Sequence, residues 1–115
     1  MADATIDLAT FEDLKATAGA DFVRELVDTF LGEAPGMLEG LRSALAANDA
    51  ERFRRTAHSL KSNSNTFGAS ELAAMARELE LGGFAAAREN GGEPLSALAH
   101  EYGRVAKELT ELKRA

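Results

Sequence analysis

The apolar residues of this chain recur three or four positions apart, the spacing that gathers side chains on one face of an α-helix. A first short pattern ends near Ala18 and Gly19, where glycine accepts the backbone angles of a helix end. The clearest pattern lies near the carboxyl end and follows Glu93 and Pro94, a pair suited to a first helical turn. The two patterns consist of Ile6, Leu8, Phe11 and Leu14, and of Leu95, Leu98, Ala99, Tyr102, Val105, Ala106, Leu109 and Leu112.

A second helix is predicted over residues 20 to about 31, where four apolar residues share a face and Asp21 favours the positive amino-terminal end. Pro35 lacks a backbone donor and disfavours helical geometry in the residue before it. We therefore expect a kink or break near residues 33 and 34. The face before Pro35 holds Phe22, Leu26, Val27 and Phe30, and the face after it holds Met37, Leu38, Leu41 and Leu45.

A central helix should begin after Asp49, a good amino-terminal cap, and end near Gly68. Ser70 is predicted to cap the next helix. The adjacent Gly82 and Gly83 weaken that helix by about 1 kcal/mol each relative to alanine, which packing can offset. We expect it to continue to about residue 89, before a loop at residues 90–92. The two core stripes are Phe53, Ala57, Leu60, Ser64 and Phe67, and Leu72, Met75, Ala76 and Leu79.

The composition favours helices over strands, because alanine and leucine are abundant and there are only two prolines and few β-branched residues. Short connections indicate that the long helices pack as antiparallel neighbours. We predict an all-α fold, an up-down antiparallel four-helix bundle with one or two short extra helices at its amino-terminal end. The 115 residues fit a single domain, 1–115. The termini suggest an independent chain, and a domain of a hybrid kinase is the alternative.

The charge and the missing residue types exclude several classes of function. A formal net charge of −6 at pH 7 argues against a nucleic-acid binder, which needs a basic surface. With no cysteine, the chain has neither disulfides nor a thiol nucleophile. No stretch resembles a signal peptide or approaches the roughly 20 apolar residues of a membrane span. We expect a cytoplasmic protein without a membrane partner.

His58 stands in a distinctive chemical setting. On the central helix it lies roughly 140° from the middle of the core stripe, so its imidazole should face outward. Histidine has an unperturbed pKa of about 6.5, so near neutral pH one ring nitrogen is free to accept a phosphoryl group. Lys61, one turn further on, is spaced to neutralise phosphate oxygens. Glu80 on the next helix is placed to accept a hydrogen bond from the other ring nitrogen.

The stretch that follows His58 resembles the signature of histidine-containing phosphotransfer (HPt) domains, roughly H-x-L-K-G-x-S-x-x-x-G-A followed by a helix. The family usually has glycine four residues after the histidine, and this chain has Ser62 there. The resemblance spans nearly the whole chain and implies a helical bundle. The matching residues are His58, Leu60, Lys61, Ser64, Phe67, Gly68, Ala69, Leu79 and Glu80.

The resemblance implies that His58 takes a phosphoryl group from the aspartyl phosphate of a response-regulator receiver domain and passes it reversibly to another receiver. A hybrid sensor histidine kinase is a further candidate partner. The receiver would supply Mg²⁺, so the chain would be a monomeric phosphocarrier without a cofactor. No nucleotide-binding glycine loop is present, so we expect no autophosphorylation from ATP. The rival interpretation is an unphosphorylated adaptor that binds and regulates a receiver or kinase.

Position matching to the family implies a docking surface around His58. Arg54 joins it because the cluster of Arg52, Arg54 and Arg55 would attract an acidic receiver pocket, although a solvated helix face explains the cluster equally well. The other candidates are Phe22, Leu26, Thr29, Ser62, Asn65 and Phe84.

Several candidate residues also have purely structural interpretations. Phe22 and Leu26 fit core positions equally well, and Glu80 has Arg77 as an alternative partner. Gly68 is expected to end a helix or to permit close backbone packing. The remaining two are Ser64, expected to bond back to its own helix, and His100, expected at the surface.

Overall fold

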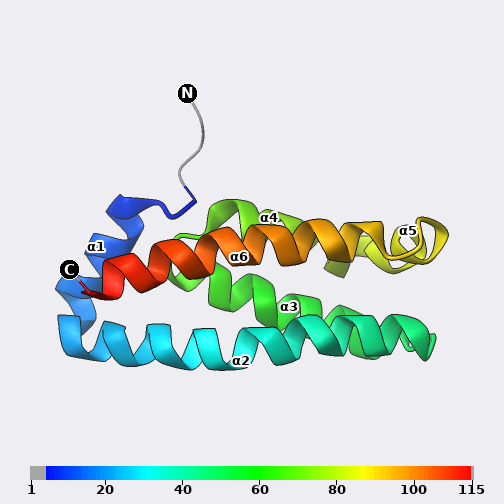
Figure 1. The fold of residues 1–115 in the computed structure, drawn as a ribbon, viewed down its shortest axis with the longest axis horizontal. Helices are drawn as coiled ribbons and strands as arrows, with labels where there is room; N and C mark the ends of the chain where they lie inside the picture. Colours follow the sequence, from blue (N-terminus) through cyan, green and yellow to red (C-terminus); the bar gives the residue numbers. More distant parts are fainter. Residues whose placement is uncertain (1–4, 115) are drawn as a thin grey trace.

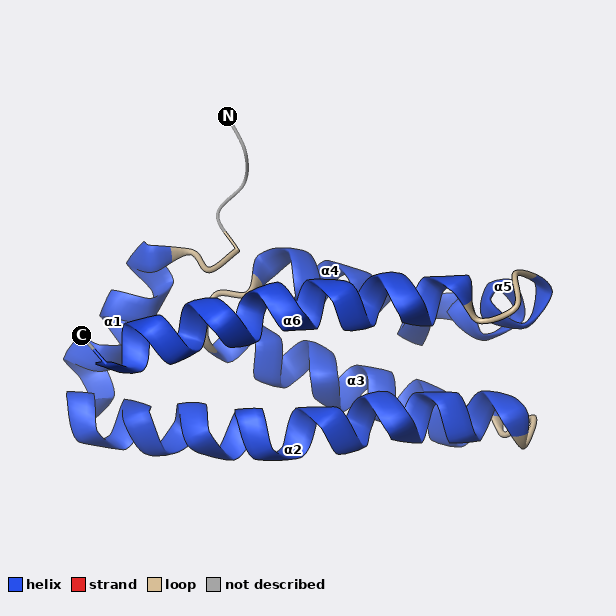
Figure 2. Ribbon diagram, viewed as in Figure 1, coloured by secondary structure: helices blue, strands red, loops and turns tan. Residues whose placement is uncertain are grey.

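The computed structural model describes residues 5–114, and every regular element in that range is helical (Figures 1 and 2). Four long arms run alternately up and down, and short α1 (Leu8–Ala18) lies across the end of the bundle where the first arm begins. The predicted all-α four-helix bundle is confirmed, with one short extra helix. The arms are α2 (Ala20–Ala46), α3 (Ala50–Thr66), a bent arm of α4 (Ser70–Glu78), η1 (Leu79–Gly83) and α5 (Phe84–Glu89), and α6 (Glu93–Arg114).

Each arm of the bundle packs mainly against its two neighbours. Helix α3 packs against α2 on one side and against α4 and η1 on the other, whereas α6 packs against α2, α4 and α5. Because the backbones of α3 and α6 do not approach each other closely, these helices occupy opposite corners of the bundle. The outward side of α3 therefore lies open between α2 and α4.

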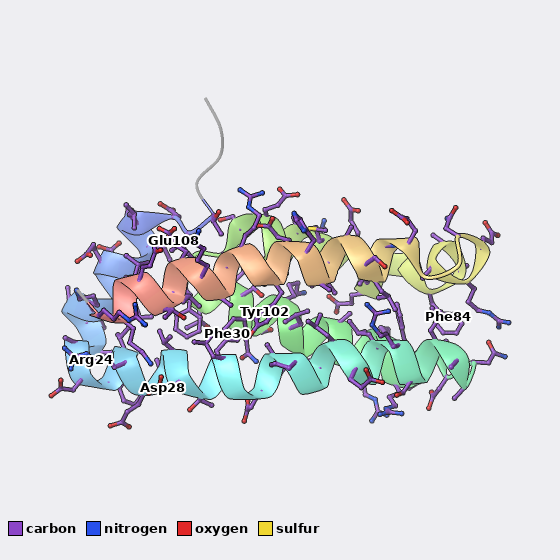
Figure 3. All side chains as sticks on the ribbon, viewed as in Figure 1. Arg24, Asp28, Phe30, Phe84, Tyr102 and Glu108 are labelled. Atoms are coloured by element: carbon purple, nitrogen blue, oxygen red, sulfur yellow. The ribbon has the colours of Figure 1, made fainter. Side chains whose placement is uncertain are left out.

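One apolar core joins the arms. Phe30 of α2 and Tyr102 of α6 meet edge to face between these helices, with ring centroids 5.9 Å apart (Figure 3). Phe30 also contacts Phe67, at 5.4 Å. Burying an aliphatic or aromatic side chain of this kind contributes about 1.5–3 kcal/mol. The largest fully buried apolar residues are Ile6, Phe11, Val27, Leu41, Phe53, Leu60, Leu72, Leu98, Val105 and Leu109.

Local chemistry sets the predicted helix ends at Gly19 and Asp49 but not at Ser70. Gly19 ends α1 with a φ of +95°, and Asp49 Oδ1 accepts a hydrogen bond from the Arg52 backbone N–H at 3.0 Å. Ser70, the predicted cap of the next helix, is instead its first residue, and Ala69 holds the cap position without a side-chain hydrogen bond. A backbone bond from Ala69 N–H to Ser64 O (2.9 Å) closes the turn and draws Ser70 into the helix.

Of the predicted kink or break near residues 33 and 34, the break is wrong, because α2 continues as one helix from Ala20 to Ala46. Proline removes the hydrogen bond to the carbonyl four residues earlier, which here belongs to Leu31. The Tyr102 hydroxyl lies 3.5 Å from that carbonyl oxygen and donates a long hydrogen bond to it from α6. Packing of α2 against both α3 and α6 then carries the helix through the proline.

The expected uninterrupted helix from Ser70 to residue 89 is also wrong. Leu81 (φ −94°, ψ 38°) and Gly82 (φ +113°) leave helical geometry, and the chain becomes helical again at Phe84. A Cβ atom on Gly83 would lie 2.9 Å from the Glu78 carbonyl oxygen, so this close approach requires glycine. The glycine pair therefore bends the arm immediately after Glu80.

Candidate functional site

Helix α3 exposes His58 on the side opposite its core stripe. The flanking residues Ala57 and Leu60 are completely buried, whereas 55% of the His58 side chain is exposed. The histidine stands in the middle of a 17-residue helix that is anchored by its apolar face. A rigid element therefore presents the ring to solvent, as the spacing predicted.

Glu80 reaches His58 from the neighbouring arm. Glu80 Oε2 lies 2.7 Å from His58 Nδ1, and only 12% of the Glu80 side chain is exposed. The bend of η1 follows directly, so Glu80 is the last residue with helical geometry before Leu81. The hydrogen bond expected from the sequence is present in the structure, and the alternative ion pair with Arg77 is not.

Lys61 approaches the other oxygen of the same carboxylate. Its Nζ lies 2.9 Å from Glu80 Oε1, a buried oxygen that has no well-oriented hydrogen bond among the described residues. The nearby Lys61 ammonium, followed by the hydrogen bond from His58, lowers the pKa of Glu80 below its ordinary value. Glu80 is therefore a carboxylate near neutral pH. The ammonium of Lys61, expected to face a phosphate, faces Glu80 in this structure.

The contact with Glu80 fixes which ring nitrogen of His58 is nucleophilic. A carboxylate only accepts hydrogen bonds, so the hydrogen between the two groups belongs to Nδ1 of the neutral ring. The other nitrogen, Nε2, then carries the free lone pair. With more than half of the side chain exposed, an electrophile can reach it from solvent.

Two further residues of the motif serve the scaffold. The hydroxyl of Ser64 is completely buried and donates to the Leu60 carbonyl at 2.7 Å. Gly68 adopts a φ of +79°, and a Cβ there would lie 2.9 Å from both Asp7 O and Thr10 Cβ. The Asp7 N–H donates to Gly68 O at 2.8 Å, which fastens the start of α1 to the turn between α3 and α4.

A basic cluster precedes His58 on α3. Arg54 Nη2 lies 2.7 Å from Glu51 Oε2, and Arg55 Nε lies 3.9 Å from the same oxygen. The hydrogen bond with Arg54 lowers the pKa of Glu51 and raises that of Arg54. Arg52 belongs to another side of the helix, since its guanidinium lies next to Gly40 of α2.

The residues expected at a docking surface fall into separate places. Ser62 and Asn65 are exposed on α3. On α2, Thr29 is exposed and Leu26 is half-buried, and both line a groove of about 120 Å³ between α2 and α3. Phe22 is 51% exposed, so it is a surface residue rather than part of the core.

Phe84 is less available than the other docking candidates. It lies toward the end of the bundle where α2 ends and α6 begins (Figure 3). Its ring meets the fully buried Phe53 edge to face at 5.3 Å, and the Arg88 guanidinium lies 6.0 Å from its centroid. Phe84 therefore contributes to the core, and only part of it is open to a partner.

Sequence reasoning missed two features. Leu81, directly after Glu80, has 63% of its surface exposed, because the bend turns it outward. Glu101 is 5% exposed on α6 and pairs with Arg104 at 3.3 Å. The exposure of Leu81 was signalled only by the glycine pair that follows it. The burial of Glu101 was signalled by its position between Leu98 and Val105 in the apolar stripe.

Other groups in the described range stand apart from the site. His100 is exposed on α6, which has no contact with α3. Residues 5–114 contain no cluster of three or more histidine and acidic side chains able to hold a metal ion. Among the described helices, none is long and apolar enough to cross a membrane.

The comparisons with known proteins agree with this geometry. The family model described as Hpt domain matches residues 25–115. A crystal structure of histidine-containing phosphotransfer protein B (HptB) from Pseudomonas aeruginosa PAO1 superimposes with a TM-score of 0.88 at 26% sequence identity, covering 98% of this chain and 97% of that one. The comparison with curated proteins found no match. The chain therefore belongs to the Hpt family, the histidine phosphotransfer domains of phosphorelays.

Proposed function

We propose that His58 is the residue that carries the phosphoryl group when this Hpt domain acts in its phosphorelay. The observation that carries the proposal is the 2.7 Å contact between Nδ1 and the Glu80 carboxylate, which leaves Nε2 as the nucleophile. Hpt domains are phosphocarriers rather than kinases, and they interact with receiver domains and kinases in two-component relays. We infer the receiver aspartyl phosphate as the donor.

In the proposed step, the Nε2 lone pair attacks phosphorus in line with the bond to the aspartyl oxygen. The N–P bond forms as the P–O bond breaks, and the receiver aspartate leaves as a carboxylate. No proton has to leave Nε2, and Nδ1 keeps its hydrogen. The ring becomes positively charged, and the Glu80 carboxylate stabilises that charge. The reverse attack by a second receiver's aspartate returns the ring to its neutral form.

The receiver is proposed to supply Mg²⁺ and the groups that stabilise the transferring phosphoryl group. The chain itself then contributes an aimed nucleophile and a docking surface. It needs no ATP site for this role. We propose that it acts as a monomer, because only three large apolar residues are exposed among the described residues, Leu8, Phe22 and Leu81, each on a different element.

The decisive experiment incubates the protein with a panel of Mg²⁺-loaded, phosphorylated receiver domains from the same cell. We expect rapid formation of acid-labile, base-stable phosphate that maps to His58. His58→Gln should abolish labelling and leave the helical spectrum unchanged, because the ring lies off the core stripe, and loss of the contact with Glu80 should lower the melting temperature only slightly. His100→Gln, an exposed histidine on α6, is the matched control and should label normally.

The adaptor remains the second candidate because Ser62 stands where the family usually has glycine. Ser62 is exposed one turn beyond His58, where its hydroxymethyl group adds bulk on the approach to the ring. Tight receiver binding without labelling, from every member of the panel, would contradict phosphotransfer and support the adaptor. Labelling that appears only in Ser62→Gly would assign the block to this side chain.

A further inference from the structure

The charged side chains next to His58 do not neutralise the negative charge that a phosphoryl group brings. In the resting protein, Lys61 (+1) and Glu80 (−1) cancel each other beside the ring, whose nucleophilic form is the neutral one. Transfer adds one negative charge in total, because a dianionic phosphoryl group arrives while the ring becomes cationic. Lys61 is also held at 2.9 Å by the carboxylate and is only 24% exposed. The inner group of three residues is thus left with a net charge of −1.

The turn of α3 before His58 contains a matching excess of positive charge. Glu51 accepts from Arg54 at 2.7 Å and lies 3.9 Å from Arg55, so one carboxylate is shared by two guanidinium groups. This group carries a net charge of +1. Both arginine side chains remain substantially in solvent, at 49% and 66% exposure, and are free to turn.

We propose that Arg54 and Arg55 form a binding site for the phosphoryl group of phosphorylated His58, with Glu51 holding the two guanidinium groups in the resting state. This inference rests on the proposed role of His58. The two arginines lie four and three residues before the histidine, positions whose Cβ atoms are about 5–6 Å away on a helix. Helical side chains lean toward the amino terminus, so the imidazole leans over this turn.

Arginine suits the task because its planar donors match phosphate oxygens in pairs. On phosphorylation of His58, the guanidinium of Arg54 or Arg55 leaves the shared Glu51 carboxylate and binds the dianionic phosphoryl group. The neighbouring Arg52 does not take part, because its guanidinium lies beside Gly40 on α2. Of the other ionic groups, Glu80 on η1 contacts the ring, and Lys61 on α3 pairs with Glu80.

The test measures the pKa of the phosphoryl group itself, by ³¹P NMR titration of protein phosphorylated on His58 with phosphoramidate or a cognate receiver. Nearby cations favour the dianion, so replacing both arginines (R54Q/R55Q) should raise this pKa by roughly half a unit, the effect of exposed charge pairs. Glu51→Gln removes the competing carboxylate and should lower it. Lys107→Gln removes one charge on α6, a helix that does not contact α3, and should change nothing.

Opposite shifts in R54Q/R55Q and Glu51→Gln would support the site. An unchanged phosphoryl pKa in R54Q/R55Q, with phosphohistidine formed normally, would overturn this inference and leave the role of His58 intact. Slower labelling by the receiver without a pKa change would assign the arginines to docking instead. A wild-type protein without any phosphohistidine resonance would overturn both proposals.

Discussion

At the scale of single residues, the site depends on Glu80. Its carboxylate contacts the ring of His58 and the ammonium of Lys61 while remaining only 12% exposed. Shielding a carboxylate from water is unfavourable unless polar partners compensate, and two donors do so here. Because these partners exist only in the folded protein, folding is linked to the ionisation of Glu80.

This linkage predicts a pH-dependent contribution to stability. The pKa of Glu80 in the folded protein lies below its ordinary value of 4.5. The ionised carboxylate therefore contributes its full stabilisation at a pH above 4.5, and this contribution is lost as the pH falls through the lower, folded-state pKa. Urea unfolding of wild type and Glu80→Gln should give a clear difference in unfolding free energy at about pH 5. The difference should shrink on further acidification.

The control for this prediction is Glu12→Gln, an exposed carboxylate on α1 without an ion-pair partner among the described residues. Its stability relative to wild type should show no comparable change with pH. A Glu80→Gln difference that stays constant down to pH 3 would show that the contacts with His58 and Lys61 do not favour the ionised carboxylate.

At the scale of elements, the spacing of apolar residues predicted which segments are helical and which face of each is buried. Tertiary contacts determined where a helix continues or bends. The stripe of α3 and the outward placement of His58 follow from the sequence alone, because both depend only on the helical period. At Pro35, the carbonyl of Leu31 that loses its helical partner accepts a long hydrogen bond from Tyr102, a residue 67 positions beyond the proline in the sequence. No local pattern signals such a partner.

The bend at η1 was hidden for a related reason. A glycine pair in the sequence weakens a helix, but it does not determine whether tertiary packing offsets that loss. Here the backbone of Gly83 passes so close to the Glu78 carbonyl that only glycine fits, and Gly82 takes a positive φ. The outcome was set by packing of Leu79 and Phe84 into the core on either side of the bend.

The bend predicts opposite effects for two glycine substitutions. Gly83→Ala places a Cβ 2.9 Å from Glu78 O and 3.0 Å from Leu79 Cδ2, so it should destabilise the protein by about 1–3 kcal/mol. Gly103→Ala, within α6 and with open space around the new Cβ, should stabilise by about 0.5–1 kcal/mol. Urea denaturation measures both.

The same pair of variants tests whether the bend positions Glu80. Gly83→Ala should also slow phosphoryl transfer to His58, since η1 follows directly on the Glu80 contact, whereas Gly103→Ala should transfer at the wild-type rate. Equal stability losses in both variants would contradict the close approach. Normal transfer in a destabilised Gly83→Ala protein would separate the bend from the chemistry.

At the scale of the whole molecule, the register of α2 against α3 places the docking candidates at different distances from the histidine. Phe30 contacts Phe67, and Gly40 lies opposite Thr56, so the two helices are antiparallel and His58 is level with about residue 38 of α2. At 1.5 Å per residue, Thr29 lies about 13 Å along the bundle from that level, and Phe22 about 24 Å.

This register predicts graded effects on receiver binding. A standard interface buries about 800 Å² per partner, a patch roughly 16 Å in radius. With about 8–10 Å between the axes of packed helices added, a patch centred on His58 reaches Thr29 at its edge and leaves Phe22 outside. Thr29→Glu should therefore weaken receiver binding about tenfold, the effect of a charge in a packed contact, and Phe22→Glu by less than about threefold. Titration calorimetry with one cognate receiver measures both.

Leu8→Glu is the matched control, because Leu8 is as exposed as Phe22 (50% and 51%) but lies on α1. It carries the same added charge and should leave the receiver affinity unchanged. If Phe22→Glu weakened binding as much as Thr29→Glu, His58 would lie at the margin of the interface, and the receiver would extend along α2 toward α1. Such a result would also turn the groove beside Leu26 and Thr29 into the centre of the contact rather than its edge.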